Sequence, residues 1–182
     1  MGLEMMPFPV AMTVLLFAAL CVVSDVRTRR IPNALSASGM LAGVVLNGSY
    51  AGIGGLETSI LGVVVLISLL LAPFAMGGIG GGDVKMMGAI GALVGARLGF
   101  AALAVGMILG GGIMLVHLAR VGRLREKLGS TGRMFSLALL MRSTEPLKAP
   151  GRAPDAISLP YSVPLALGTL AAVVASQVMG RS

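Results

Sequence analysis

Long apolar runs dominate the chain, each separated from the next by a short group of glycine, proline or charged residues. A helix that crosses a bilayer needs about 20 predominantly apolar residues. The runs are this long and show no alternation of polar and apolar positions, so they predict membrane-spanning helices. We expect six of them, at residues 8–24, 33–53, 56–76, 84–97, 99–118 and 157–179.

Breaker residues mark the expected ends of these helices. Pro32 stops the first helix because proline lacks an N–H and pushes Ile31 out of helical geometry. Asn33 is expected to cap the second helix. The stretch from Val84 to His117 would be about 50 Å long as one helix, which is too long for one crossing. We therefore divide this stretch at residues 97–99.

The basic residues predict how the helices are oriented. If the N-terminus lies outside, the connections 25–33, 77–85 and 119–156 lie inside. Only Arg97 and Arg181 of the 14 Lys and Arg residues then remain outside. Basic residues accumulate on the cytoplasmic side of membrane proteins, so an outside N-terminus is expected.

The composition agrees with a membrane protein. Hydrophobic residues make up 56% of the chain and charged residues 12%, with a mean hydropathy of +0.95. A soluble domain carries about 25% charged residues, so a soluble globule is excluded, as is a disordered chain. We expect one all-α, polytopic membrane domain over residues 1–182, with the lipid bilayer as a partner.

Residues 133–142 of the basic connection are expected to lie along the inner membrane surface, with a solvated loop as the alternative.

Residue counts exclude several kinds of chemistry. The single cysteine, Cys21, cannot form an internal disulfide, and with the single histidine, His117, it cannot build a usual zinc site. We therefore expect no metal and no cofactor. The net charge of +7 follows from the basic inner connections, and the chain has no tryptophan and only 4% aromatic residues. A nucleic-acid partner is not expected, because few side chains could stack on bases.

Glycines recur at four-residue spacing along the predicted spans. Such rows let helices approach closely in lipid, where packing provides the attraction between them. We expect close helix packing at Gly39/Gly43, Gly48/Gly52, Gly91/Gly95/Gly99 and Gly106/Gly110.

Two of the seven carboxylates need a further explanation. The other five lie in the N-terminal tail, at the outer start of a span or in the basic connection, where solvation accounts for them. Asp25 and Asp83 adjoin apolar spans, and the predicted topology places both at the same depth on the inner side. Taken singly, each is equally well explained as an interfacial acid, Asp25 paired with Arg29 and Asp83 capping its helix.

Two acids at one depth also suit hydrolysis by water. An ionised carboxylate deprotonates the water while a protonated partner polarises the carbonyl, and mutual repulsion keeps the second proton bound. Asp25 ends a helix and Asp83 begins one, and a helix dipole favours negative charge at its N-terminus. We hypothesise that Asp83 is the base and Asp25 carries the proton, an assignment that Arg27, Arg29 and Arg30 oppose.

The segment before Asp83, residues 77–82, contains five glycines. Its bare backbone could approach a peptide main chain closely, adopt positive φ, or pair with an extended substrate. A plain flexible turn between helices is the alternative. The segment is not a phosphate loop, because no Gly-Lys-Ser/Thr follows.

These residues resemble a known family. Gly80-Gly81-Gly82-Asp83-Val84-Lys85 is similar to the Gly-x-Gly-Asp-x-Lys motif of type IV prepilin peptidases, and Asp25 followed by Ile31-Pro32-Asn33 is similar to their first aspartate segment. Leu159-Pro160-Tyr161 is a weaker match. The resemblance implies an aspartic membrane endopeptidase that cleaves the basic leader of a prepilin, its partner, at the cytoplasmic face of the bacterial inner membrane. It implies Asp25 and Asp83 as the catalytic pair, and Gly80, Gly81, Gly82, Lys85, Pro32 and Asn33 as residues that bind substrate or shape the site.

The chain departs from the longer members of that family. Those members carry an additional cytoplasmic region with paired cysteines and also methylate the new N-terminus, whereas only residues 26–32 follow Asp25 before the second helix here. The resemblance to the short, Flp-type (tight-adherence) branch implies a peptidase without methyltransferase activity. Lys85 is equally well explained as an ordinary inner lysine. The alternatives to a peptidase are a proton- or ion-coupled transporter subunit and a non-catalytic subunit of a secretion machine.

Overall fold

A computed structural model describes residues 6–76, 79–122 and 161–179. The described chain forms helices α1 (Phe8–Thr28), α2 (Asn33–Ala75), α3 (Gly81–Arg120) and α5 (Ser162–Met179). All four are long and apolar enough to cross a membrane. The expected all-α fold is therefore confirmed for the residues that the structure describes, and the length and apolar composition of these helices agree with the expected membrane protein. The expected segment 133–142 lies outside the described residues.

Helix α2 is 43 residues long and contains one residue with a non-helical backbone, Gly52 (φ 57°, ψ −134°). The Asn47 Nδ2 donates a hydrogen bond to Ser59 Oγ at 2.9 Å. These residues would lie about 18 Å apart in a continuous helix, so the two halves of α2 fold back on each other. The sequence predicts the connection after residue 53, whereas the structure has it at Gly52.

Helix α3 is interrupted in the same way, at Gly95 (φ 77°, ψ 173°). A Cβ placed on Gly99 would lie 3.6 Å from Cα of Gly91, so the segments on either side of Gly95 are adjacent. The expected boundary at residues 97–99 was two residues too late. Gly95 takes the position because a positive φ is readily adopted by glycine and strains a residue such as Arg97.

Helix α3 is the centre of the molecule, because it contacts α1, α2 and α5, whereas α2 and α5 do not contact each other in the described structure. Its first half supplies fully buried side chains, including Met86, Met87 and Ile90. These pack with buried residues of the neighbouring helices, among them Val14 and Leu66. The core therefore surrounds the segment that follows Asp83.

The expected glycine packing is confirmed at several positions. A Cβ on Gly43 would clash with the backbone of Ala92, one on Gly91 with the backbone of Gly62, and one on Gly106 would lie 3.0 Å from Cα of Leu165. Gly52 was predicted wrongly as a packing residue. A Cβ there would meet nothing within 4 Å, and its positive φ shows that it serves the chain reversal.

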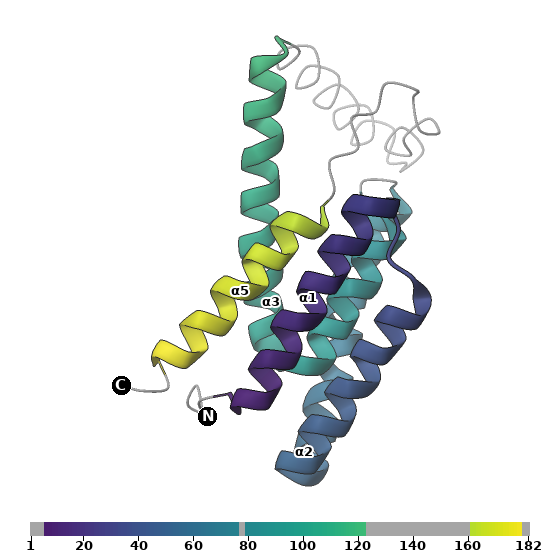
Figure 1. The fold of residues 1–182 in the computed structure, drawn as a ribbon, viewed down its shortest axis with the longest axis vertical. Helices are drawn as coiled ribbons and strands as arrows, with labels where there is room; N and C mark the ends of the chain where they lie inside the picture. The colour runs from purple at the N-terminus through teal and green to yellow at the C-terminus, as the bar shows by residue number, and fades with distance from the viewer. Residues whose placement is uncertain (1–5, 77–78, 123–160, 180–182) are drawn as a thin grey trace, which may run out of the picture.

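Three helix ends gather at one end of the bundle (Figure 1). The last turn of α1 and the first turns of α3 and α5 lie there, and the first residues of α1 and the last residues of α5 lie at the opposite end. The second half of α3 extends beyond the other helices. This arrangement brings segments from the beginning, middle and end of the chain to one place.

Candidate active site

Asp25 lies in the last turn of α1, which extends to Thr28 rather than ending at residue 24. The backbone N–H of Arg29 donates to the Asp25 carbonyl at 2.7 Å and closes the helix. The hydroxyls of Ser24 and Thr28 both donate to the Arg30 carbonyl, at 2.9 and 3.0 Å. These bonds hold the chain in a defined turn directly after Asp25, whose side chain is half-buried.

Asp83 is the third residue of α3 and is buried, with 9% of its surface exposed. Its expected role as the N-cap is wrong, because Gly80 holds the cap position. The Asp83 side chain instead reaches back and accepts a hydrogen bond from the backbone N–H of Gly80. This is the acidic half of a capping box, and it holds the carboxylate at the start of α3.

The side chains of Asp25 and Asp83 lie in the same region of the molecule. Asp25 and Asp83 are close enough for their charges to interact, although 57 residues of chain separate them. Two acids within this range repel when both are ionised, which favours a state in which they hold one proton between them. That state can activate a water molecule and polarise a carbonyl at the same time.

Ser162 also belongs to this cluster, although the sequence did not predict it as a site residue. It is the first residue of α5, it is fully buried, and its hydroxyl donates to Asp25 Oδ2 at 2.6 Å. The only signal in the sequence was the weak match just before it, Leu159-Pro160-Tyr161. A serine at a helix start is common for capping alone, so its residue type does not point to Asp25.

The position of α5 also changes the electrostatics at Asp25. The positive end of the α5 dipole faces this carboxylate through Ser162, and it opposes the negative end of the α1 dipole. The two helix ends at Asp25 therefore oppose each other, whereas Asp83 lies only at the start of α3. The hypothesis that Asp83 is the base and Asp25 carries the proton stays a prediction.

A hydrogen bond between Lys85 and Asn33 joins the segment that contains Asp83 to the segment that follows Asp25. The Lys85 Nζ donates to Asn33 Oδ1 at 2.7 Å, connecting the first turns of α3 and α2. The expected capping role of Asn33 is wrong, because Pro32 occupies the cap position and no side chain bonds there. The Pro32 carbonyl accepts hydrogen bonds from the backbone N–H groups of Leu35 and Ser36, so Pro32 starts α2. The side chain of Asn33 is therefore available to bind Lys85.

The glycines directly before Asp83 have ordinary backbone conformations. Gly81 and Gly82 belong to the first turn of α3, and Gly80, Gly81 and Gly82 are not among the residues with positive φ. A Cβ on Gly82 would lie 3.5 Å from Ile31, and one on Gly81 would lie 3.3 Å from Phe74. Residues 77 and 78 lie outside the described chain, so the expected pairing with a substrate strand stays a prediction.

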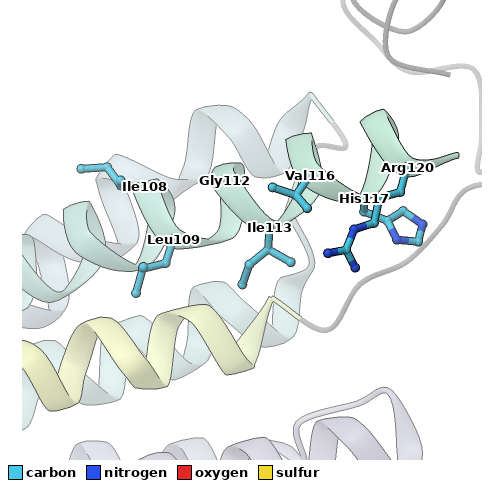
Figure 2. A pocket seen from close by; sticks show the side chains of 7 residues that line it. All are labelled: Ile108, Leu109, Gly112, Ile113, Val116, His117 and Arg120. Carbon is cyan, nitrogen blue, oxygen red and sulfur yellow. The ribbon is translucent and has the colours of Figure 1, made fainter. Parts of the chain in front are cut away.

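A shallow hollow of about 460 Å³ lies elsewhere, on the second half of α3 (Figure 2). Its lining is apolar except for His117 and Arg120 at the end of the helix. It contains neither aspartate, so it is not the candidate site. Among the residues that the structure describes, no three His, Cys, Asp or Glu side chains are grouped so that they could hold a metal ion.

Comparison with known families bears directly on this cluster. A model described as the type IV leader peptidase family matches residues 12–115, which is more than half of the chain and includes both aspartates. The chain belongs to the type IV leader peptidase family. No curated protein and no solved structure matched it. Membership of the type IV leader peptidase family makes the protein a peptidase, and its apolar helices indicate that it is a membrane peptidase.

The matched residues end before α5. Ser162 therefore lies outside the part of the chain that the family model covers, although its hydroxyl contacts the Asp25 carboxylate inside that part. The candidate site of this leader peptidase is thus made from both matched and unmatched segments.

Proposed function

We propose that this protein is an aspartic endopeptidase that removes the basic leader of type IV prepilins at the cytoplasmic face of the bacterial inner membrane. The observation that carries the proposal is that the end of α1, with Asp25, and the start of α3, with Asp83, lie at one end of the bundle, close enough for the two carboxylates to interact. Membership of the leader peptidase family supports it. The family match also argues against the transporter and assembly-subunit alternatives.

In the proposed reaction, the ionised member of the pair takes a proton from water, and the water oxygen attacks the scissile carbonyl carbon. The protonated member donates a hydrogen bond to the carbonyl oxygen. Collapse of the intermediate breaks the C–N bond, and the leaving amine takes up a proton from the pair. One water is consumed, a carboxylate and a new N-terminus are released, and the pair again holds one proton.

We further propose that the chain crosses the membrane six times with its N-terminus outside. The reversals at Gly52 and Gly95 support this topology, because each divides a long helix into two adjacent segments. The short segment between α1 and α2 supports the assignment to the Flp-type branch and a peptidase without methyltransferase activity.

Single substitutions of the two aspartates test the catalytic proposal. Co-expressed with a prepilin, Asp25→Asn and Asp83→Asn are each expected to abolish leader removal, because neither variant retains two ionisable carboxyls. Glu57→Gln, which alters an exposed acid on α2, is the matched control and is expected to process normally. Leader removal is measured from the decrease in size of the pilin. The mass of the processed pilin is expected to show no added methyl group, as a peptidase without methyltransferase activity would leave it. Retained processing in either aspartate variant would favour a transporter or assembly subunit.

A further inference from the structure

We propose that Ser162 is a positioning residue that holds the Asp25 carboxylate in its reactive orientation. The inference rests on the proposed function, since it assigns Ser162 a part in the reaction of that pair. It makes α5 a component of the site rather than only a packing helix.

The geometry of the Ser162 contact carries the inference. The hydroxyl-to-carboxylate distance is 2.6 Å, which is typical of a strong O–H···O⁻ hydrogen bond. Ser162 is fully buried, so its hydroxyl does not exchange this partner for bulk water. The bond engages Oδ2 of the carboxylate. A strong hydrogen bond to one oxygen restricts rotation of the carboxylate, and so it fixes the direction in which the second oxygen points.

The other polar groups buried on α5 behave differently. The hydroxyl of Thr169 donates to the Leu165 carbonyl, and that of Ser176 donates to the Val173 carbonyl, both within the helix itself. Their bonds satisfy the hydroxyls locally and reach no other helix. Ser162 instead donates to α1, which is the pattern expected of a residue that orients a reacting group.

Each acid of the pair is therefore held by a different donor. The Gly80 backbone N–H binds Asp83, and the Ser162 hydroxyl binds Asp25. A backbone donor is fixed by the start of α3, whereas the Ser162 donor depends on where α5 packs. Removing the Ser162 hydroxyl should loosen Asp25 while leaving Asp83 in place.

The kinetic test compares Ser162→Ala, Ser162→Thr and Ser176→Ala in purified full-length protein. The substrate is a synthetic peptide with a basic leader followed by an apolar helix. Ser162→Ala is expected to lower kcat about 10- to 100-fold with little change in KM, because a misplaced catalytic group costs rate rather than binding. Ser162→Thr should recover most of that loss because it keeps the hydroxyl, and Ser176→Ala should match the wild type. Wild-type kcat in Ser162→Ala would overturn the inference while leaving the proposed function intact.

A second measurement does not depend on activity. The chain has three aspartates, Asp25, Asp83 and Asp155, so ¹³C labelling of aspartate carboxyls gives three signals, and Asp25→Asn identifies one of them. Ser162→Ala is expected to shift the Asp25 signal, while Ser176→Ala leaves it unchanged. An unmoved Asp25 signal would refute the positioning role. A wild-type protein that fails to cleave, but whose Asp25 signal shifts in Ser162→Ala, would refute the proposed function and preserve the contact.

Discussion

Arg29 is in a left-handed backbone conformation, with φ 52°, directly after the turn that carries Asp25. This conformation brings the Cβ of an L-residue too close to its own backbone and costs about 1–2 kcal/mol. Here it lets the Arg29 N–H close α1 on the Asp25 carbonyl. The strained residue thus lies close to Asp25, a candidate catalytic residue whose position depends on the backbone at the end of α1.

The strain at Arg29 can be measured with a matched pair of variants. Arg29→Ala and Arg29→Gly both lose the side chain, but glycine adopts positive φ without a Cβ clash. We expect the glycine variant to have a higher free energy of unfolding than the alanine variant, by about 1 kcal/mol. Denaturant unfolding in detergent micelles measures the difference. An alanine variant at least as stable as the glycine variant would show that this position is not strained.

At the scale of the elements, the reversal of α3 at Gly95 leaves carbonyl groups without helical partners, as every helix end does. The Asn47 Nδ2 of α2 donates to two of them, the Ala92 and Leu93 carbonyls, at 2.9 and 3.1 Å. The Ser59 hydroxyl donates to the Ala92 carbonyl as well, at 2.8 Å. Since lipid offers no hydrogen bonds, this polar group makes the reversal possible inside the bundle.

We expect Asn47→Ala to destabilise the protein by about 2 kcal/mol, because it removes a donor from buried carbonyls. Ser49→Ala is the control on the same helix, since Ser49 is exposed and its hydroxyl donates to the Val45 carbonyl within that helix. Its free energy of unfolding should stay within about 0.5 kcal/mol of the wild type. Equal stabilities for the two variants would contradict the role given to Asn47.

The apolar runs were sufficient to predict the helices, because only a helix satisfies its own backbone in lipid. They could not locate the reversals, since glycine serves both close packing and positive φ. Gly52 and Gly95 are spaced like the packing glycines, yet both turn the chain. Asp25 and Asp83 were recognisable because acids beside apolar spans are costly. Ser162 was not, because its partner lies 137 residues away and only the fold brings the two together.

At the scale of the whole molecule, the proposed topology places the two reversals and the two aspartates at opposite faces of the membrane. The natural cysteine, Cys21, is buried, so a Cys21→Ala background allows single cysteines to be placed at exposed positions. Ile53 adjoins the first reversal and Ala34 lies in the first turn of α2, and both are exposed. In the proposed topology, these two positions therefore lie on opposite sides of the membrane.

An impermeant maleimide applied to intact cells is expected to label Ile53→Cys and to leave Ala34→Cys unlabelled. Inverted vesicles should give the opposite result, because the positive-inside rule places the start of α2 in the cytoplasm. Labelling of both cysteines from one side would eliminate the proposed reversal of α2 across the bilayer. Labelling with the two sides exchanged would place the N-terminus inside.

The contact between Ser162 and Asp25 also has a consequence for biosynthesis. The ribosome makes Asp25 and Asp83 well before Ser162, so a growing chain already holds both acids in the membrane while the hydroxyl that orients one of them does not yet exist. Full proteolytic activity is then expected only after α5 inserts. A nascent or C-terminally truncated chain, in which Asp25 has no Ser162 donor, would cleave its neighbours in the membrane more slowly than the finished protein, which limits unwanted proteolysis during synthesis.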